Sequence, residues 1–293
     1  MDIDCRYIFI GNRMAVLNKL IENHCDIKKI YAVKDSFLAK ELKCREIHFK
    51  TIGSKSEFIS DLKHDNYDIL VSNGCPYILP INYLNNGRRK FINIHPSLLP
   101  DLRGKHPING AILYNRRHGV TCHLMDDGID TGEIVEQIEI PIDNNINLDL
   151  LYKITFLMEG EVFERALKKH FSPDGIYREN SNCIYYTRCE DDMLIKNTDN
   201  IDMIIRRINA FNTKGLYAKI KYNDHFIRLI DCKVIKNDNY LHLFGNYPNF
   251  TIIDKYGNGF FLYKSKTSLL QFETLDIDLI NIGEEIIIGN EYE

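Results

Sequence analysis

Short apolar runs alternate with helix-like segments through the first quarter of the chain. These runs have the continuous apolar content of buried strands and cover residues 5–10, 28–33, 46–49 and 68–73. The segments between them are expected to be helical and cover residues 15–21, 35–42 and 54–64. Alternation of this kind predicts a parallel sheet with helices on both faces. We therefore expect a Rossmann-like α/β fold at the start of the chain.

The alternation continues until about residue 170, where a different pattern begins. Beyond the strand expected at 91–95, we expect a helix at 107–117, strands at 120–125 and 133–140, and a long helix at 147–170. Turn-forming residues then cluster at 171–182. This cluster places a domain boundary between a catalytic domain at 1–180 and a smaller α+β, β-rich domain at 181–293.

The second domain is expected to hold one helix near 200–211, followed by short strands. The breaks between these strands are polar or contain glycine, and they lie at 222–224, 236–239 and 256–259. Hairpin-like strands are expected within 240–275.

Composition limits the classes of protein to which the chain can belong. No apolar run approaches the roughly 20 residues that a membrane-spanning helix needs. The first residues lack the basic and apolar regions of a signal peptide, so a cytoplasmic protein is expected. The eight cysteines form no CxxC pair, which indicates neither a zinc site nor a disulfide framework. A formal charge of -4 predicts no general affinity for nucleic acid or acidic membranes.

The stretch from Phe91 to Gln137 gathers polar residues between apolar strands. An apolar strand stops at His95-Pro96, and α/β sheets carry their chemistry at the ends of buried strands. The polar residues of this stretch are Asn93, His95, His106, His123 and Asp130. These residues are the first candidates for a functional site.

The same stretch contains two motifs, Asn-x-His-Pro-Ser-Leu-Leu-Pro at 93–100 and Asp-x-Gly-x-Asp-x-Gly at 126–132. Together they resemble the formyltransferase family that uses 10-formyltetrahydrofolate, and the resemblance covers residues 1–180 well. It implies that Asn93, His95 and Asp130 form the catalytic trio. It also implies 10-formyltetrahydrofolate as the co-substrate and requires no metal.

These residue types suit formyl transfer to an amine. The Asn93 amide can donate a hydrogen bond to the negative charge that develops on the formyl oxygen. The imidazole of His95 can take or relay the proton, or share the oxyanion when it is charged. A carboxylate at Asp130 would favour the imidazolium form of His95 and fix its orientation.

The resemblance also assigns a folate pocket. The apolar loop 74–80 is expected to line it, with Tyr77, Ile78 and Leu79 as cofactor-binding positions. The alternative reading is that Ile78 and Leu79 are simply core residues. Asp127 is placed on the cofactor side too, although Asp126 and Asp127 could serve only the turn.

Acceptor binding is predicted at two places. A strand, a glycine turn and a helix start bring together Gly11, Asn12 and Arg13, where backbone N–H groups and a guanidinium could hold an anionic group. Arg13 could equally be an ordinary surface charge. The turn after the first motif adds Arg103, Lys105 and His106 on the acceptor side. His106 could instead lie at the surface, and His123 could be either functional or buried core.

The family divides by the amine that it formylates. The purine-type enzyme is a single domain about as large as residues 1–180, so the additional hundred residues argue against it. A tRNA acceptor requires basic surface, whereas residues 181–293 hold 13 Lys or Arg against 16 Asp or Glu. By elimination the chain resembles the sugar N-formyltransferases that act on dTDP-linked amino-dideoxysugars in O-antigen synthesis. Its Ile-Gly-Asn-Arg and Arg-Gly-x-x-Pro-Ile segments fit that group.

The best single acceptor on this basis is dTDP-4-amino-4,6-dideoxyglucose, although no residue distinguishes a 4-amino from a 3-amino sugar. A formyltetrahydrofolate hydrolase and a non-enzymatic folate or nucleotide-sugar binder are the alternatives from other classes. The resemblance further implies a homodimer formed through the C-terminal part. Apolar residues for such a surface are Leu241, Leu243, Phe244, Phe260, Phe261 and Leu262, which could instead pack only within their own domain.

Overall fold

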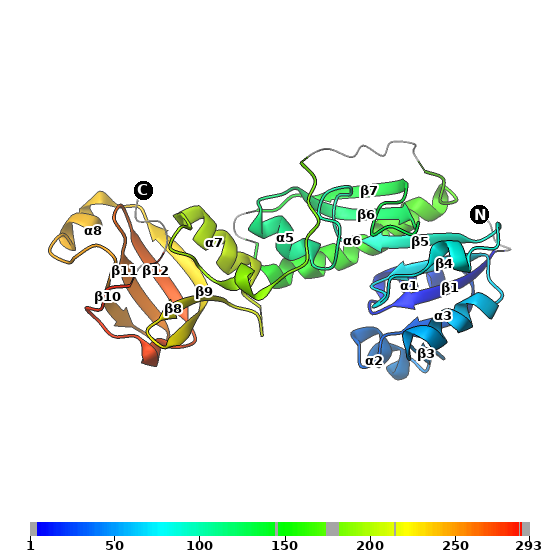
Figure 1. Cartoon of the computed structure of the whole chain (residues 1–293), viewed down its shortest axis with the longest axis horizontal. Helices are drawn as coiled ribbons and strands as arrows, with labels where there is room; N and C mark the ends of the chain where they lie inside the picture. Colours follow the sequence, from blue (N-terminus) through cyan, green and yellow to red (C-terminus); the bar gives the residue numbers. More distant parts are fainter. Residues whose placement is uncertain (1–4, 144–145, 174–181, 214, 287, 289–293) are drawn as a thin grey trace. The chain divides into compact units, whose positions relative to one another are not determined.

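Seven strands form one sheet in the part of the chain that the computed structural model describes, which comprises residues 5–143, 146–173, 182–213, 215–286 and 288 (Figure 1). They are β1 (Arg6–Gly11), β2 (Asp26–Ala32), β3 (Lys50–Thr51), β4 (Ile69–Asn73), β5 (Lys90–His95), β6 (His118–Leu124) and β7 (Ile134–Ile140). Their order is β3-β2-β1-β4-β5-β6-β7. In this order, each pair of neighbours from β3 through β5 is parallel. Strand β6 pairs antiparallel with β5 on one side and with β7 on the other. The predicted mostly parallel, Rossmann-like sheet is confirmed.

Helices follow the strands as the alternation predicts. They are α1 (Ala15–Glu22), α2 (Phe37–Cys44), α3 (Lys55–His64), α4 (Ile81–Leu84), α5 (Pro107–Leu113) and α6 (Leu148–Lys168). Two of them begin at a serine whose hydroxyl accepts a hydrogen bond from the first turn, Ser36 from Ala39 N and Ser54 from Glu57 N. Such caps satisfy N–H groups that have no partner inside the helix.

Two predicted elements have different bounds in the structure. A strand was expected at 46–49, but Glu46 has a φ of 55° and the Ile47 N–H bonds to the Leu42 carbonyl, so these residues close the end of α2. The helix expected at 107–117 stops at Leu113, because Asn115 has a φ of 49° and the Arg116 N–H bonds back to Ala111. A left-handed residue follows the end of each helix, and at Asn115 it ends α5 earlier than apolar spacing indicates.

Strand order reverses between β1 and β4, because β1 leads to β2 on one side and β4 leads to β5 on the other. The two strands approach so closely at their ends that a side chain at Gly11 would lie 2.6 Å from the Asn73 carbonyl oxygen. The Asn12 N–H donates to the same oxygen at 3.2 Å. Open α/β sheets bind their ligands where the strand order reverses, beyond the carboxyl ends of the strands. Strand β5 ends at His95 next to this point.

Residues of the second half form a separate antiparallel sheet. Within the described residues its order is β10-β11-β12-β9-β8. The elements are α7 (Ile201–Ala210), β8 (Ala218–Tyr222), β9 (His225–Ile235), α8 (Asp238–Leu243), β10 (Thr251–Tyr256), β11 (Phe260–Lys264) and β12 (Leu269–Thr274), with short 3-10 helices at Glu190–Met193 and Ile277–Leu279. The predicted smaller, β-rich second part is confirmed.

One face of this second sheet packs against α7. Ile204 and Ile208 of the helix join a buried cluster with Phe261 and Phe272, whose rings stack at 5.0 Å. Ile204 and Ile208 can pack together because residues four apart share one face of a helix. The cluster is the core of the second part of the chain.

The expectation of hairpin-like strands throughout 240–275 is wrong for its first residues. Residues 238–243 form α8, which begins where the Asn237 side chain accepts from the Asn239 N–H at 3.0 Å. Leu241 packs beside a small apolar cluster of the sheet, and Leu243 is 71% exposed. A capping asparagine therefore overrides an apolar pattern that also fits a strand.

The described chain divides into two compact units. One comprises Met1–Pro107, Arg117–Ile142 and Leu151–Tyr186, and the other comprises Ile108–Arg116, Asp143–Leu150 and Thr187–Glu293. The predicted boundary at 180/181 falls outside the described residues, so the assignment of 1–180 to catalysis stays a prediction. None of the described helices is both long and apolar enough to cross a bilayer.

A buried ion pair provides a stability test of the second unit. Arg207 contacts Asp199 through Nε at 2.6 Å and through Nη2 at 3.2 Å, and both side chains are buried. Because removing one partner leaves a buried charge unpaired, Arg207→Met is expected to lower the free energy of unfolding by about 3–5 kcal/mol. Urea denaturation measures this loss. Arg206→Met on the same helix is the control, and an equal loss in both variants would contradict the prediction.

Candidate active site

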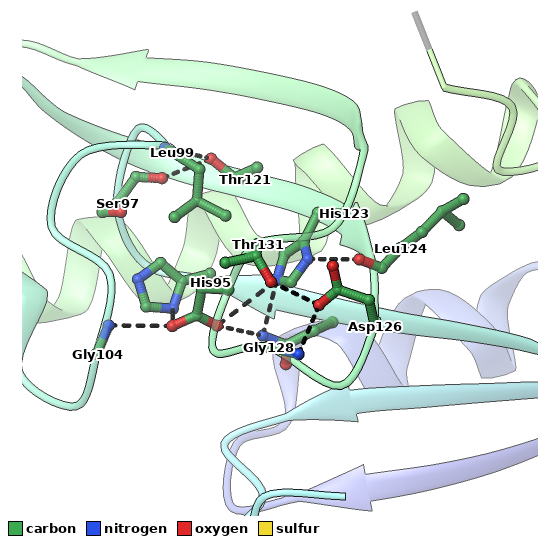
Figure 2. A network of polar contacts seen from close by, with 12 residues as sticks. His95, Ser97, Leu99, Gly104, Thr121, His123, Leu124, Asp126, Gly128 and Thr131 are labelled. Carbon is green, nitrogen blue, oxygen red and sulfur yellow. Dashed lines mark hydrogen bonds and ion pairs between the residues drawn. The ribbon is translucent and has the colours of Figure 1, made fainter. Parts of the chain in front are cut away.

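Strand β5 places Asn93 and His95 on the same face of the sheet, because residues two apart along a strand share a face. The antiparallel register of β5 and β6 sets His123 directly opposite Asn93 and Thr121 opposite His95. Directly opposite residues also share a face. Asp130 enters from the loop between β6 and β7 and meets the other three side chains. The structure thus brings the predicted trio together and adds His123 to it. Figure 2 shows His95 and His123 in this cluster.

Asp130 is the centre of this cluster, with a side chain that is only 12% exposed. Its Oδ2 lies 3.5 Å from His95 Nδ1 and accepts the Gly104 N–H at 3.0 Å. Its Oδ1 lies 3.4 Å from Asn93 Nδ2 and 3.7 Å from His123 Nε2. Burial alone would raise the pKa of Asp130, but the two histidines and the Gly104 N–H outweigh burial and hold the pKa well below its usual range. The carboxylate therefore stays ionised.

A backbone carbonyl fixes the proton on His95. Nε2 lies 3.0 Å from the Leu102 carbonyl oxygen, which can only accept, so Nε2 carries the hydrogen. This leaves Nδ1, which faces Asp130, as the atom that gains or loses a proton. Burial lowers the pKa of His95 below its ordinary value, and the charge of Asp130 opposes part of this shift. His95 is consequently neutral at neutral pH and can accept a proton at Nδ1.

His123 orients the amide of Asn93. Its Nδ1 lies 2.7 Å from the Leu124 carbonyl, so this nitrogen carries the hydrogen (Figure 2). Nε2 then accepts from Asn93 Nδ2 at 3.1 Å. The sequence left His123 open between function and core, and the structure shows a buried histidine that also contacts the trio. The register of β5 against β6 is the signal that would have identified it.

The turn that follows His95 is held by Thr121 of β6. The Thr121 hydroxyl donates to the Ser97 carbonyl at 2.6 Å and accepts from the Leu99 N–H at 3.1 Å (Figure 2). Further along, Ser97 Oγ donates to the Asp101 carbonyl at 2.8 Å. These bonds fix the chain that carries Leu102 and Gly104 back to the histidine and the carboxylate.

The predicted folate positions differ in what their side chains do. Leu79 is buried in the core of the first unit, as the alternative reading of the sequence held, whereas Ile78 is 58% exposed. The Tyr77 hydroxyl donates to the Gly53 carbonyl at 2.9 Å. Asp127 accepts the Asn82 N–H at 3.0 Å and also contacts the Asn82 amide, which ties the acidic loop to α4. Among the three apolar-loop positions, Ile78 is thus the one with an exposed side chain.

Asp126 serves the turn itself. Its Oδ1 accepts from the Gly128 N–H at 3.0 Å and from the Thr131 hydroxyl at 2.6 Å (Figure 2). These bonds hold the loop in the shape that directs Asp130, whose φ is 54°, toward the two histidines. The turn role weighed for Asp126 from the sequence agrees with these contacts.

The predicted anion-binding residue Arg13 already has a partner. Its Nε lies 2.9 Å from Glu159 Oε2 of α6, and its guanidinium lies 4.5 Å from the centre of the Phe156 ring. Glu159 is fully buried, and burial raises its pKa to about 7 against the opposing effects of Arg13 and Asn73. Gly11 and Asn12 lie at the carboxyl end of β1, beside β4. Any anion at this place would share Arg13 with Glu159.

The remaining predicted acceptor residues lie in the turn after Leu102. The Arg103 carbonyl accepts the Tyr186 N–H at 2.7 Å, and the Lys105 N–H donates to the Tyr186 carbonyl at 3.2 Å. Lys105 is exposed and His106 is half-buried. Among the described residues, no group of three or more His, Cys, Asp or Glu side chains could hold a metal ion.

Comparison with known proteins shows what the part of the chain that carries this site is similar to. Residues 23–167 match the formyl transferase family model. The chain is 30% identical over 170 residues to methionyl-tRNA formyltransferase of Syntrophomonas wolfei, covering 56% of this chain and 54% of the relative. It is 35% identical over 189 residues to methionyl-tRNA formyltransferase of Clostridioides difficile, covering 61% of this chain and 59% of the relative. The chain spans little more than half the length of these relatives. The predicted resemblance to formyltransferases is confirmed.

Solved structures with this fold align over 78% to 93% of this chain. The sugar 3N-formyl transferase WlaRD, determined in the presence of dTDP and 5-N-formyl-THF, has a TM-score of 0.70 at 20% identity and covers 93% of this chain and 98% of its own. An N-formyltransferase of Helicobacter canadensis, in complex with folinic acid and dTDP-3-aminofucose, gives 0.68 at 18% identity with coverages of 92% and 98%. A 4-N formyltransferase of Francisella tularensis has a TM-score of 0.63 at 21% identity and covers 78% of this chain and 98% of its own. These likenesses establish the fold.

Glu159 makes stability depend on pH. Because its pKa of about 7 lies above the ordinary 4.5, the folded protein holds a proton that the unfolded chain releases between these values. The contribution of this group to stability is therefore full below about pH 4.5 and declines as the pH rises to about 7. Glu159→Gln is expected to remove this decline, measured by urea denaturation at several pH values. The exposed Glu161→Gln is the control, and an unchanged slope in Glu159→Gln would contradict the assignment.

Proposed function

We propose that this chain is an N-formyltransferase that moves a formyl group from 10-formyltetrahydrofolate to the amino group of a dTDP-linked amino-dideoxysugar. The observation that carries the proposal is the buried cluster of Asn93, His95, His123 and Asp130, located in a domain that resembles formyltransferases. The ligands in the structures of WlaRD and the Helicobacter canadensis protein, a folate with dTDP or a dTDP-sugar, support the choice of substrates.

The cluster supplies what the reaction needs. The neutral amine attacks the formyl carbon, a new C–N bond forms, and negative charge develops on the formyl oxygen. Asn93 Nδ2 donates to that oxygen when it gives up its long 3.4 Å contact with Asp130. His95 Nδ1 takes the proton that the attacking nitrogen loses and delivers it to N10 of the folate as the C–N10 bond breaks. Asp130 stays ionised and stabilises the imidazolium that forms between these steps.

A methionyl-tRNA acceptor is the second candidate, because the curated relatives described above are methionyl-tRNA formyltransferases. The charge of the second part of the chain argues against it, since residues 181–293 hold 13 basic and 16 acidic side chains. A protein that binds a polyanion gains its affinity from basic residues that neutralise phosphates. We therefore place the sugar acceptor first.

Acceptor choice is tested by incubating the protein with 10-formyltetrahydrofolate and one acceptor at a time. We expect tetrahydrofolate release with dTDP-4-amino- or dTDP-3-amino-dideoxysugars, and the faster of the two identifies the position of the amine. If methionyl-tRNA were the only acceptor that gave tetrahydrofolate release, the acceptor would be tRNA and not a sugar. Release of formate without any acceptor would identify a hydrolase. Thermal unfolding in the presence of dTDP, UDP or GDP identifies the nucleotide. The nucleotide that binds the folded state raises the midpoint temperature of unfolding.

Removal of the proposed oxyanion donor should slow the chemical step. Asn93→Ala is expected to lower kcat by about 100- to 1,000-fold, the usual effect of deleting one such donor, while KM for the folate changes little. Steady-state kinetics with the best acceptor measures both constants. The exposed Asn86→Ala is the matched control, and kcat within twofold of the wild type in Asn93→Ala would contradict the role assigned to Asn93.

The pH profile tests the pairing of His95 with Asp130. Because His95 must be neutral to accept a proton and burial lowers its pKa, the acid limb of kcat should lie below the ordinary value of 6.5. Asp130 raises the pKa of His95, so Asp130→Asn should move this limb to still lower pH while lowering the plateau. A limb that moves to higher pH in Asp130→Asn would show that the carboxylate does not act on His95.

A further inference from the structure

A single loop supplies one backbone contact to each of two catalytic side chains. Within Asp101–Lys105, which we call the 101–105 loop, the Leu102 carbonyl accepts from His95 Nε2 and the Gly104 N–H donates to Asp130, both at 3.0 Å. Leu102 has a φ of 58° and Gly104 a φ of 110°. For a residue such as leucine this left-handed conformation is unfavourable, so contacts from elsewhere must hold it in place.

Two residues that lie far along the chain, Ile184 and Tyr186, provide such contacts. The Ile184 N–H donates to Asp101 Oδ1 at 2.9 Å, although 83 positions separate the two residues. The Tyr186 N–H donates to the Arg103 carbonyl at 2.7 Å, and the Tyr186 carbonyl accepts from the Lys105 N–H at 3.2 Å. Ile184–Tyr186, which we call the strap, therefore pairs with the loop like a short parallel strand.

The two sets of contacts alternate along the loop. Positions 101, 103 and 105 bond to the strap, and positions 102 and 104 bond to His95 and Asp130. The two residues that bond to the catalytic side chains, Leu102 and Gly104, are also the two with a positive φ, so both contacts depend on this backbone conformation.

Close packing leaves the strap and the loop little freedom to separate or slide. A side chain at Gly104 would lie 2.5 Å from the Tyr186 carbonyl oxygen and 3.1 Å from the Tyr185 ring. The side chain of Tyr186 is buried. Glycine is thus required at position 104 both for its φ and for the approach of the strap.

We propose that Ile184–Tyr186 are positioning residues for formyl transfer, which act on His95 and Asp130 through the 101–105 loop. The inference rests on the proposed function for its kinetic consequence. It extends the site beyond residues 23–167, where the family match lies, because the strap follows that match. The strap contacts neither His95 nor Asp130 through any of the bonds described above, and it acts by fixing the backbone that does.

Two full-length variants test the strap from its two sides. Ile184→Pro removes the donating N–H, and Asp101→Ala removes its acceptor, while Asp101→Asn keeps an acceptor oxygen. We expect kcat to fall at least tenfold in the first two variants, with KM for the folate within twofold of the wild type and with kcat largely restored in Asp101→Asn. Cys183→Ala, next to the strap, is the control and should match the wild type.

Hydrogen exchange of the Gly104 amide gives a readout that needs no turnover. We expect exchange to be at least tenfold faster in Ile184→Pro and Asp101→Ala, with the midpoint of global unfolding unchanged. Wild-type exchange at Gly104 together with wild-type kcat in these variants would overturn the strap. A midpoint that falls in proportion to kcat in both variants would also overturn it, as a general loss of stability. A wild-type protein that formylates no acceptor would refute the proposed function, whereas the exchange result would still decide the strap.

Discussion

A buried carboxylate is the constraint on which the site depends. Asp130 carries its charge with little access to water, and an isolated buried charge is strongly unfavourable. Two donors compensate it, namely the N–H of Gly104 and the amide of Asn93, and the rings of His95 and His123 lie beside it. Each comes from a different position of the sheet or its loops, so the fold must be complete before the carboxylate can be accommodated. The same compensation gives the histidine and the amide fixed orientations.

The two histidines have different tasks because different carbonyls fix their protons. Leu102 holds the hydrogen of His95 on Nε2, which leaves Nδ1 toward the carboxylate. Leu124 holds the hydrogen of His123 on Nδ1, which leaves Nε2 to accept from Asn93. One imidazole is thus set to move a proton, and the other is set to orient an amide. Identical side chains acquire separate roles from their backbone partners.

The sequence predicts the periodic elements well because apolar period and capping residues are local signals. It predicts that the sheet of the first unit is mostly parallel, and it places Asn93 and His95 on one strand. It does not predict α8, where one capping asparagine decides between helix and strand. The Leu102 carbonyl, the Gly104 N–H and the strap also escape it, because backbone contacts across 83 positions leave no mark in residue type apart from a glycine. The sequence also does not predict the partner of Arg13, Glu159 on α6, because the two residues lie far apart along the chain.

The most direct test of this account is the protonation of the His95 ring, read from the 15N chemical shifts of its two nitrogens across a pH titration of the wild-type protein. The account predicts that neutral His95 carries its hydrogen on Nε2, and that Nδ1 gains a proton with a pKa below the ordinary 6.5. A neutral ring with its hydrogen on Nδ1 would contradict it, because that nitrogen could then not accept a proton from the attacking amine.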